Sequence, residues 1–151
     1  KCWSMTGWRL GWIVAPAAFE AKLGQLTEFN TSCTAGFVQE AGIAALRGGE
    51  EEIASLLSKI QAGYEITAER LNTFSRVEFI EPDGAFYCFF RVDGLTDSFA
   101  AAGEILEQTK VGLAPGVAFG PQGEGYLRLC YAQPVDVLEE AFARLEPFLS
   151  K

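Results

Sequence analysis

The sequence predicts an α/β fold, and two observations support this prediction. Apolar residues have largely helical composition and spacing through residues 17–74, and from Arg76 they alternate with a period of two. Beyond that point, two helical patterns, residues 98–110 and 135–149, alternate with short runs that have the composition of strands. Helices that alternate with short strands are typical of helices packed on a sheet, so we expect an α/β sandwich.

The first half of the chain predicts one strand and three helices. Residues 8–16 (WRLGWIVAP) alternate and then run apolar up to a proline, which predicts a buried strand that needs partner strands. Residues 17–26 and 34–46 predict helices, and Gly48 ends the second. Residues 50–74 predict a long amphipathic helix that bridges two lobes. Its three leading glutamates suit a helix start, and we prefer this interpretation to a metal site.

The second half predicts strands and helices in alternation. Residues 77–80 and 85–92 predict two adjacent strands, joined through a turn at residues 82–84 (PDG). The remaining predicted elements are a capped helix (98–110), a short strand (111–114), a glycine-rich loop (116–125), a last strand (126–132) and a last helix (135–149).

Composition excludes several classes of function. The chain has 151 residues, 49% of them hydrophobic, which suffices for one core, or for one small domain plus part of another. Asp and Glu outnumber Lys and Arg by 20 to 12, so the net charge of −8 argues against nucleic acid as a partner. The sequence contains no run of about 18 apolar residues, so it predicts no membrane span. The first residues lack the pattern of a signal peptide, so we expect a cytoplasmic protein.

Residue types also limit the chemistry. The four cysteines are far apart and the chain contains no histidine, so we expect no metal site and no Ser-His or Cys-His nucleophile. We expect the cysteines to be buried and reduced rather than disulfide-bonded. Catalysis would then depend on a lysine, a carboxylate or a cofactor.

Three segments carry specific motifs. Residues 1–11 (KCWSMTGWRLG) resemble the cofactor-lysine segment of class I/II aminotransferases, S-K-x-x-x-M-T-G-W-R-x-G, from the lysine onwards. Residues 82–87 (PDGAFY) are similar to the family's P-x-G-A-F-Y turn, and residues 125–132 (GYLRLCYA) to its G-Y-x-R-x-x-x-A strand. The resemblance covers essentially the whole chain and implies a fold type I enzyme that depends on pyridoxal 5'-phosphate.

The resemblance implies roles for two residues of the first motif. Lys1 would be the catalytic Schiff-base lysine that binds the cofactor, which requires an uncharged amine when it attacks. Arg9 would bind the cofactor phosphate, to which a guanidinium offers a planar fork of donors. Without the motif, Lys1 would be interpreted as a solvated terminal residue and Arg9 as a surface arginine beside Trp8.

Arg128 is the candidate for binding substrate. It stands between Leu127 and Leu129 in the last predicted strand, where a lone arginine is costly unless it meets an anion. The resemblance implies that Arg128 binds the α-carboxylate of the substrate, and the alternative is an ion pair within the protein. Phe86 and Tyr87 could edge the active site, but we favour core packing for both.

The resemblance also predicts the organisation of the protein. We expect the C-terminal part of the pyridoxal-phosphate-dependent transferase fold: a remnant of the large domain (1–49), a bridging helix (50–75) and a small α/β domain (76–151). The family's other cofactor contacts precede the lysine, so we expect part of a homodimeric enzyme that transfers an amino group from an amino acid to a 2-oxo acid, inactive by itself. The alternatives are a lyase of the same fold and a non-catalytic module.

Overall fold

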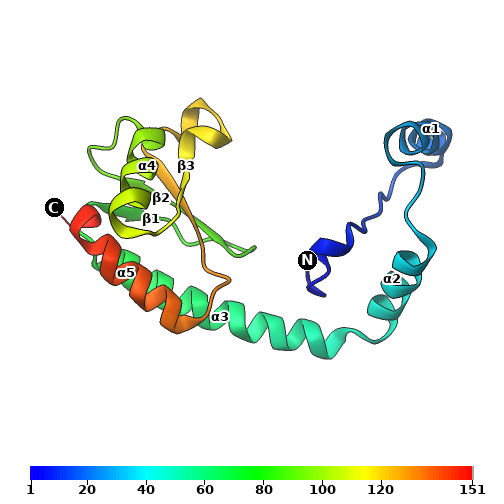
Figure 1. Cartoon of the computed structure of the whole chain (residues 1–151), viewed down its shortest axis with the longest axis horizontal. Helices are drawn as coiled ribbons and strands as arrows, with labels where there is room; N and C mark the ends of the chain where they lie inside the picture. Colours follow the sequence, from blue (N-terminus) through cyan, green and yellow to red (C-terminus); the bar gives the residue numbers. More distant parts are fainter. Residues whose placement is uncertain (151) are drawn as a thin grey trace. The chain divides into compact units, whose positions relative to one another are not determined.

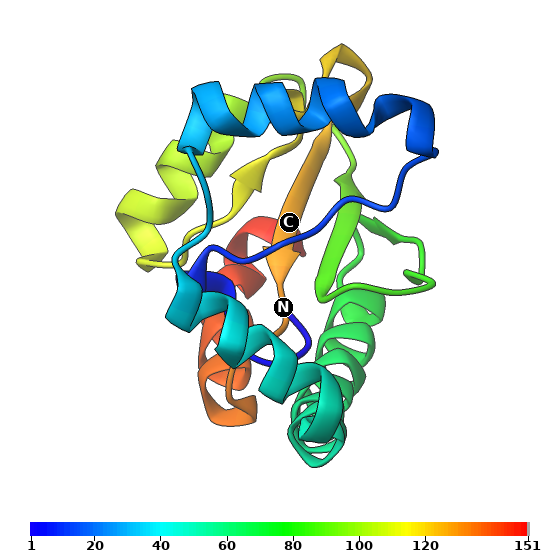
Figure 2. The same ribbon diagram turned by 90° about the vertical axis from the view of Figure 1, so that its right-hand side faces the viewer.

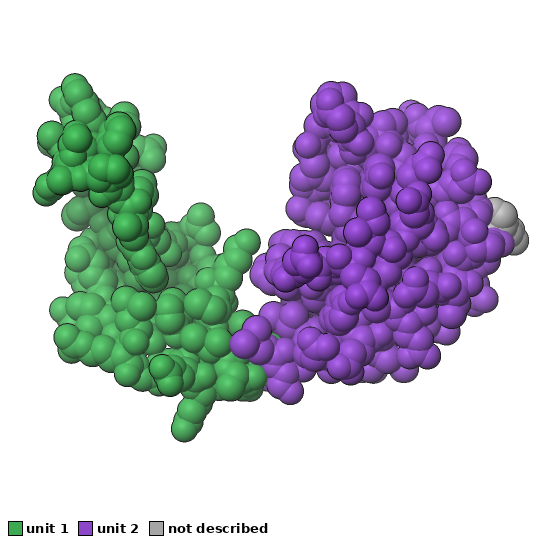
Figure 3. Space-filling model, turned by 180° about the vertical axis from the view of Figure 1, so that it is seen from behind, with its two compact units in different colours: residues 1–56 green, residues 57–151 purple. Residues whose placement is uncertain are grey.

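The computed structural model describes residues 1–150, and the chain divides into two compact units, Lys1–Leu56 and Leu57–Lys151 (Figure 3). The boundary between the units falls inside helix α3 (Glu50–Thr73), so each unit contains part of that helix. The predicted helix at residues 50–74 is confirmed almost to the residue. The predicted division into three parts, 1–49, 50–75 and 76–151, remains a prediction.

The first unit is built from short helical segments (Figure 1). Its elements are the 3-10 helices η1 (Thr6–Trp8) and η2 (Ala17–Phe19), the helices α1 (Glu20–Thr31) and α2 (Gly36–Gly48), and the start of α3. Only Val38 and Gly42 are buried among the residues of this unit. Large apolar side chains such as Phe29 and Phe37 are exposed, so this unit has almost no core of its own.

The strand predicted at residues 8–16 is wrong. After η1 these residues form no helix and pair with no strand anywhere in the described chain. Trp12, Ile13 and Val14, expected to be buried, are 61%, 73% and 91% exposed. The apolar pattern indicated only that burial of these side chains would be favourable. A strand also needs a neighbouring strand for its backbone hydrogen bonds, and residues 1–150 supply none.

The second unit contains one antiparallel sheet of four strands in the order β1-β2-β4-β3. The strands are β1 (Val77–Phe79), β2 (Tyr87–Val92), β3 (Ala114–Pro115) and β4 (Tyr126–Cys130). The predicted neighbours β1 and β2 do pair, with Val77 opposite Val92. The central strand β4 lies between β2 and β3 (Figure 2). The strand predicted at residues 111–114 is shorter and begins later, at Ala114.

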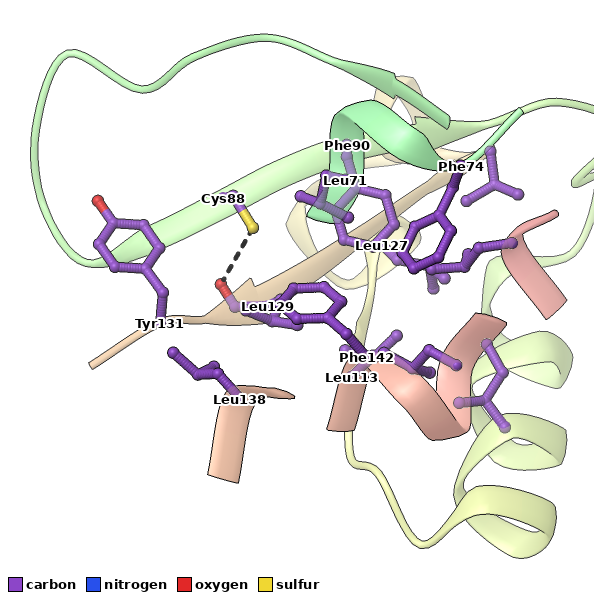
Figure 4. Close-up of a cluster of buried hydrophobic side chains, with 14 of the residues drawn as sticks. Leu71, Phe74, Cys88, Phe90, Leu113, Leu127, Leu129, Tyr131, Leu138 and Phe142 are labelled. Atoms are coloured by element: carbon purple, nitrogen blue, oxygen red, sulfur yellow. Dashed lines mark hydrogen bonds between the residues drawn. The ribbon is translucent and has the colours of Figure 1, made fainter. Parts of the chain in front are cut away.

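Three helices share the core of the second unit with one face of this sheet. They are α3, α4 (Ser98–Thr109) and α5 (Val135–Leu149). Figure 4 shows the cluster, in which Phe142 of α5 and Phe90 of β2 are both 0% exposed. Burying an aromatic side chain of this kind stabilises a fold by about 1.5–3 kcal/mol, so this unit contains its own source of stability.

Two close approaches in the second unit require glycine. Gly63 of α3 lies against the backbone carbonyl of Tyr131, and a Cβ added there would come far inside the 3.0 Å that real Cβ atoms keep. Gly116 and Gly123 touch each other's backbones in the same way. The first contact lets α3 approach the end of β4, and the second closes the loop between β3 and β4.

The cysteines differ from expectation in their burial. All four are free thiols, but Cys2 and Cys33 are exposed and Cys130 is half-buried, so only Cys88 among the described cysteines is buried. Cys2 and Cys33 belong to the first unit, where almost nothing is buried. The helices of residues 1–150 include none with the length and apolar character that crossing a membrane would require.

Candidate active site

Lys1 lines a hollow in the first unit. The hollow has a volume of about 400 Å³ and is bordered by Lys1, Trp3, Leu10 and Trp12, together with two residues of α2, Gly42 and Ala45. The carbonyl of Lys1 accepts a hydrogen bond of 3.0 Å from the amide of Ser4, which turns the chain at its first residues. Lys1 thus borders a hollow whose other bordering side chains are largely apolar.

Two small residues of α2 and its end hold this segment in place. Leu10 packs directly over Gly42, and the indole of Trp3 packs over Gly49, so that a Cβ at either glycine would collide with the side chain above it. The glycines therefore let the motif segment lie close against α2. This packing explains why residues 1–11 have a defined course although they form no regular strand.

Arg9 adopts a strained backbone conformation at the end of η1. Its φ is +53°, and Ser4 on the other side of η1 has φ +52°. Left-handed conformations of this kind cost about 1–2 kcal/mol for residues other than glycine and occur preferentially at functional sites. The Arg9 guanidinium folds back and donates a 3.0 Å hydrogen bond from Nη1 to the carbonyl of Thr6. One nitrogen of the guanidinium is therefore hydrogen-bonded within the turn at η1, and the side chain as a whole remains exposed.

Arg128 lies on the open face of the sheet in the second unit. In β4, Leu127 and Leu129 point into the core, and Arg128 between them points to the opposite face. Its strand partner Phe89 shares that face. The guanidinium carbon of Arg128 lies over two aromatic rings, 4.3 Å from the centre of Tyr87 and 4.2 Å from the centre of Phe119. Such cation–π contacts stabilise a guanidinium without occupying its N–H groups.

The ion pair considered as an alternative for Arg128 is absent from the described residues. The ion pairs of residues 1–150 are Arg91 with Glu78, at 3.4 Å, and Arg144 with Glu140. Arg128 therefore has aromatic neighbours in place of a carboxylate. The core-packing interpretation of the neighbouring aromatics applies to Phe86, which packs against the core, and not to Tyr87, which contacts Arg128.

Phe119 is the residue that the sequence analysis missed. It ends the 3-10 helix η3 (Gly116–Phe119) and precedes η4 (Pro121–Gly123) in the loop that was predicted only as glycine-rich. A phenylalanine in a loop of glycines, 51% exposed, was the available signal. The ring also meets Phe89 edge-on, with 5.9 Å between the ring centres, and Phe89 stacks on Tyr126 at 4.9 Å.

The candidate residues thus fall into two groups. Lys1 and Arg9 belong to the first unit, on either side of a turn at η1, and Arg128 with its aromatic neighbours belongs to the second. Thr6 and Gly7 are the first two residues of η1 and lie between Lys1 and Arg9 in the sequence.

Cys88 and Glu124 are two of the four described groups in the second unit whose pKa values are shifted; the others are Tyr64 and Tyr131. Burial raises the pKa of the Cys88 thiol to about 12, against hydrogen bonds to backbone groups that lower it. The thiol points at the carbonyl of Leu129, with 3.8 Å between Sγ and O (Figure 4). Hydrogen bonds from the amides of Gly125 and Ser98 hold the pKa of Glu124 below its ordinary value. Cys88 is therefore an unreactive core residue, and Glu124 is a structural anion.

Comparison with known proteins shows the family that the three motifs resemble. The family model described as aminotransferase class I and II matches residues 1–145. The putative aminotransferase YugH of Bacillus subtilis is 34% identical over 100% of the chain, and an aspartate aminotransferase of Pyrococcus horikoshii is 38% identical over 99% of it. The chain spans 39% of the length of each of these two relatives.

Solved structures agree with the fold. An aromatic aminotransferase from Pyrococcus horikoshii superposes with a TM-score of 0.91 at 32% identity, over 99% of this chain and 40% of that one. An aspartate aminotransferase from Thermotoga maritima gives a TM-score of 0.86 at 34% identity, over 98% and 37%. The predicted fold, the C-terminal part of the aminotransferase fold, is confirmed.

Proposed function

The chain belongs to the class I and II aminotransferase family, and on that premise we propose that it contributes the cofactor lysine and two anion-binding arginines to an aminotransferase that uses pyridoxal 5'-phosphate. The observation that carries the proposal is the match of residues 1–11 to the lysine segment, with Lys1 at the edge of a hollow in the first unit. Bound pyridoxal phosphate would supply an electron sink for the bond broken at the amino acid's Cα.

The residues of the first unit suit this cofactor. The aldehyde of pyridoxal phosphate needs a primary amine, which Lys1 provides, and its phosphate needs a cation that stays charged, which Arg9 provides. Strain at Ser4 and Arg9 supports a functional role for the turn between them. Lys1 would hold the cofactor covalently and, once displaced by the substrate amine, would move the proton to and from Cα as general base and acid.

Arg128 would bind the α-carboxylate of the amino acid. The cation–π contacts with Tyr87 and Phe119 use none of its N–H groups, so the planar guanidinium would be able to donate two parallel hydrogen bonds to a carboxylate. The absence of an acidic partner for Arg128 in the described residues supports this role, because an unpaired cation in a half-buried position gains most from an incoming anion.

Activity requires more than this chain in our proposal. A pyridinium-nitrogen partner and a ring-stacking aromatic are part of the site that the resemblance implies, and we expect them from the protein at its full natural length. We further propose a cytoplasmic homodimer. We propose an amino acid with a neutral or aromatic side chain as the donor, since no basic residue stands between Gln25 and Gly42 to bind a second carboxylate.

The test of this function is a chemical label. The protein at its full natural length, incubated with pyridoxal phosphate, should show an absorbance band in the visible range that borohydride bleaches. Peptide mapping should then place the pyridoxyl group on Lys1. Lys59, an exposed lysine of α3, is the internal control that should stay unlabelled.

The possible results separate the alternatives. A label on any lysine other than Lys1 contradicts the assignment, and a colourless protein that ignores added cofactor favours the non-catalytic module. A labelled protein that releases ammonia, with no amino group passed to 2-oxoglutarate, would identify a lyase.

A further inference from the structure

Two aromatic rings from separate parts of the second unit meet at the guanidinium of Arg128. Tyr87 begins β2, and Phe119 ends η3, yet the guanidinium carbon lies within 4.3 Å of both ring centres. We call Tyr87 and Phe119 the aromatic pair. Each ring attracts the cation that lies over it, and this cation–π contact does not use the N–H groups of the guanidinium.

The loop that carries Phe119 is tightly fixed. Gly116 and Gly123 are in backbone contact that admits no Cβ. The buried hydroxyl of Ser98, at the start of α4, accepts a 3.2 Å hydrogen bond from the amide of Val117. The carboxylate of Glu124 accepts hydrogen bonds from the amides of Ser98 (2.6 Å) and Gly125 (2.9 Å). The loop is therefore tied at both ends, and Phe119 is presented at a defined position.

The other ring is fixed by the sheet. Tyr87 is paired with Cys130 in the β2–β4 ladder, and Phe89, directly opposite Arg128, sits two residues further along the same face. Phe89 in turn supports Phe119 edge-on. The aromatic pair thus rests on the backbone ladder at one side and on a closed loop at the other. An arginine side chain has many rotamers in solution, and contacts of this kind restrict them before any ligand arrives.

We propose that Tyr87 and Phe119 are positioning residues for Arg128: they hold its guanidinium in the orientation that receives a ligand carboxylate, so that little side-chain ordering is left to occur on binding. The proposal rests on the proposed role of Arg128 in carboxylate binding. It adds that the affinity for the carboxylate depends on two rings that donate no hydrogen bond to it.

The experiment uses the protein at its full natural length, labelled with ¹⁵N-arginine, and acetate as the carboxylate probe. The Nε–Hε signal of Arg128, assigned through its loss in Arg128→Ala, should lie upfield because of the ring currents of the aromatic pair. Acetate should shift this signal, with chloride at equal ionic strength as the reference.

Phe119→Leu and Tyr87→Leu should each move the Arg128 signal downfield. Each substitution should raise the Kd for acetate by about 5-fold. This loss of affinity corresponds to about 1 kcal/mol, at 1.4 kcal/mol per factor of ten. Phe119→Tyr keeps a ring and should restore both the signal and the affinity. Phe99→Leu is the matched control, because Phe99 of α4 is also an exposed phenylalanine, at 73%, and makes no ring contact with Arg128.

The results distinguish the two levels of the proposal. If Phe119→Leu leaves both the Arg128 signal and the Kd for acetate unchanged, the positioning role is wrong, even if acetate binds. If Phe119→Tyr fails to restore them, the ring is not what matters, and the positioning role is again refuted. If acetate never shifts the Arg128 signal in the unaltered protein, the carboxylate-binding role in the proposed function is wrong, and the positioning role falls with it.

Discussion

Gly63 and Gly103 provide a matched pair of helix-interior glycines with opposite surroundings. Gly63 lies in α3 and Gly103 in α4. A methyl group at Gly103 would meet nothing within 4 Å, whereas one at Gly63 would be driven into the carbonyl of Tyr131 and would stand 3.3 Å from Cδ1 of Leu138. Replacing each glycine by alanine therefore changes helix propensity equally and packing very differently.

The magnitudes follow from these surroundings. Alanine is about 1 kcal/mol better than glycine in a helix interior, so Gly103→Ala should stabilise the second unit by roughly that amount. Gly63→Ala gains the same propensity but overpacks a site, at a cost of typically about 1–3 kcal/mol and more where the obstacle is backbone. The contact atom is a carbonyl oxygen of the chain that follows β4, which cannot rotate away, so a net loss of about 1–2 kcal/mol is expected.

Urea denaturation of the protein at its full natural length, followed by circular dichroism, measures both changes. The midpoint for Gly103→Ala should rise and that for Gly63→Ala should fall, with unchanged slopes. A Gly63→Ala midpoint equal to that of Gly103→Ala would refute the reasoning, because it would show that α3 does not press against Tyr131.

Three further predictions concern the site and its supports. Arg9→Ala should weaken retention of pyridoxal phosphate, whereas Arg128→Ala should keep the cofactor colour and raise the KM for the amino acid, a loss of about 2–5 kcal/mol for a charge-assisted pair. Equal loss of cofactor in both would contradict the division of roles. Glu124 has a lowered pKa, so its carboxylate stabilises the fold above the ordinary glutamate pKa, and this stability is lost as pH falls through the folded-state pKa. The thermal midpoints of the unaltered protein and of Glu124→Gln, measured against pH, should therefore converge at the acid end. Midpoints that differ by the same amount at every pH would contradict a stabilising role of the Glu124 carboxylate. The 151-residue chain by itself should associate in size-exclusion chromatography and show no transaminase turnover with added cofactor, and an active monomer would contradict this.

The sequence by itself determined most of the regular elements. The helical pattern at residues 50–74 corresponds to α3. The strand predicted at residues 85–92, after the turn at residues 82–84, corresponds to β2, which begins at Tyr87. Asp97 caps α4 by accepting a 2.9 Å hydrogen bond from the amide of Ala100, so the predicted capped helix begins where expected. Local propensity, capping and periodicity act within a few residues, which is why they can be recognised without the fold.

Tertiary structure decided the first segment. Residues 8–16 have a strand's composition, but Val14 is 91% exposed and no described strand pairs with it. An apolar run expresses only a preference for burial, while a strand depends on hydrogen bonds to another strand, and that partner cannot be deduced from the run itself.

Tertiary structure also decided the surroundings of Arg128. The sequence identified this arginine between Leu127 and Leu129, and the family motif implied its role. It could not show that the β2–β4 register and a loop closed by Gly116 and Gly123 bring Tyr87 and Phe119 to the guanidinium. Phe119 is nine residues from Arg128 and Tyr87 is on another strand, and contacts over such separations arise from register and loop closure rather than from local pattern.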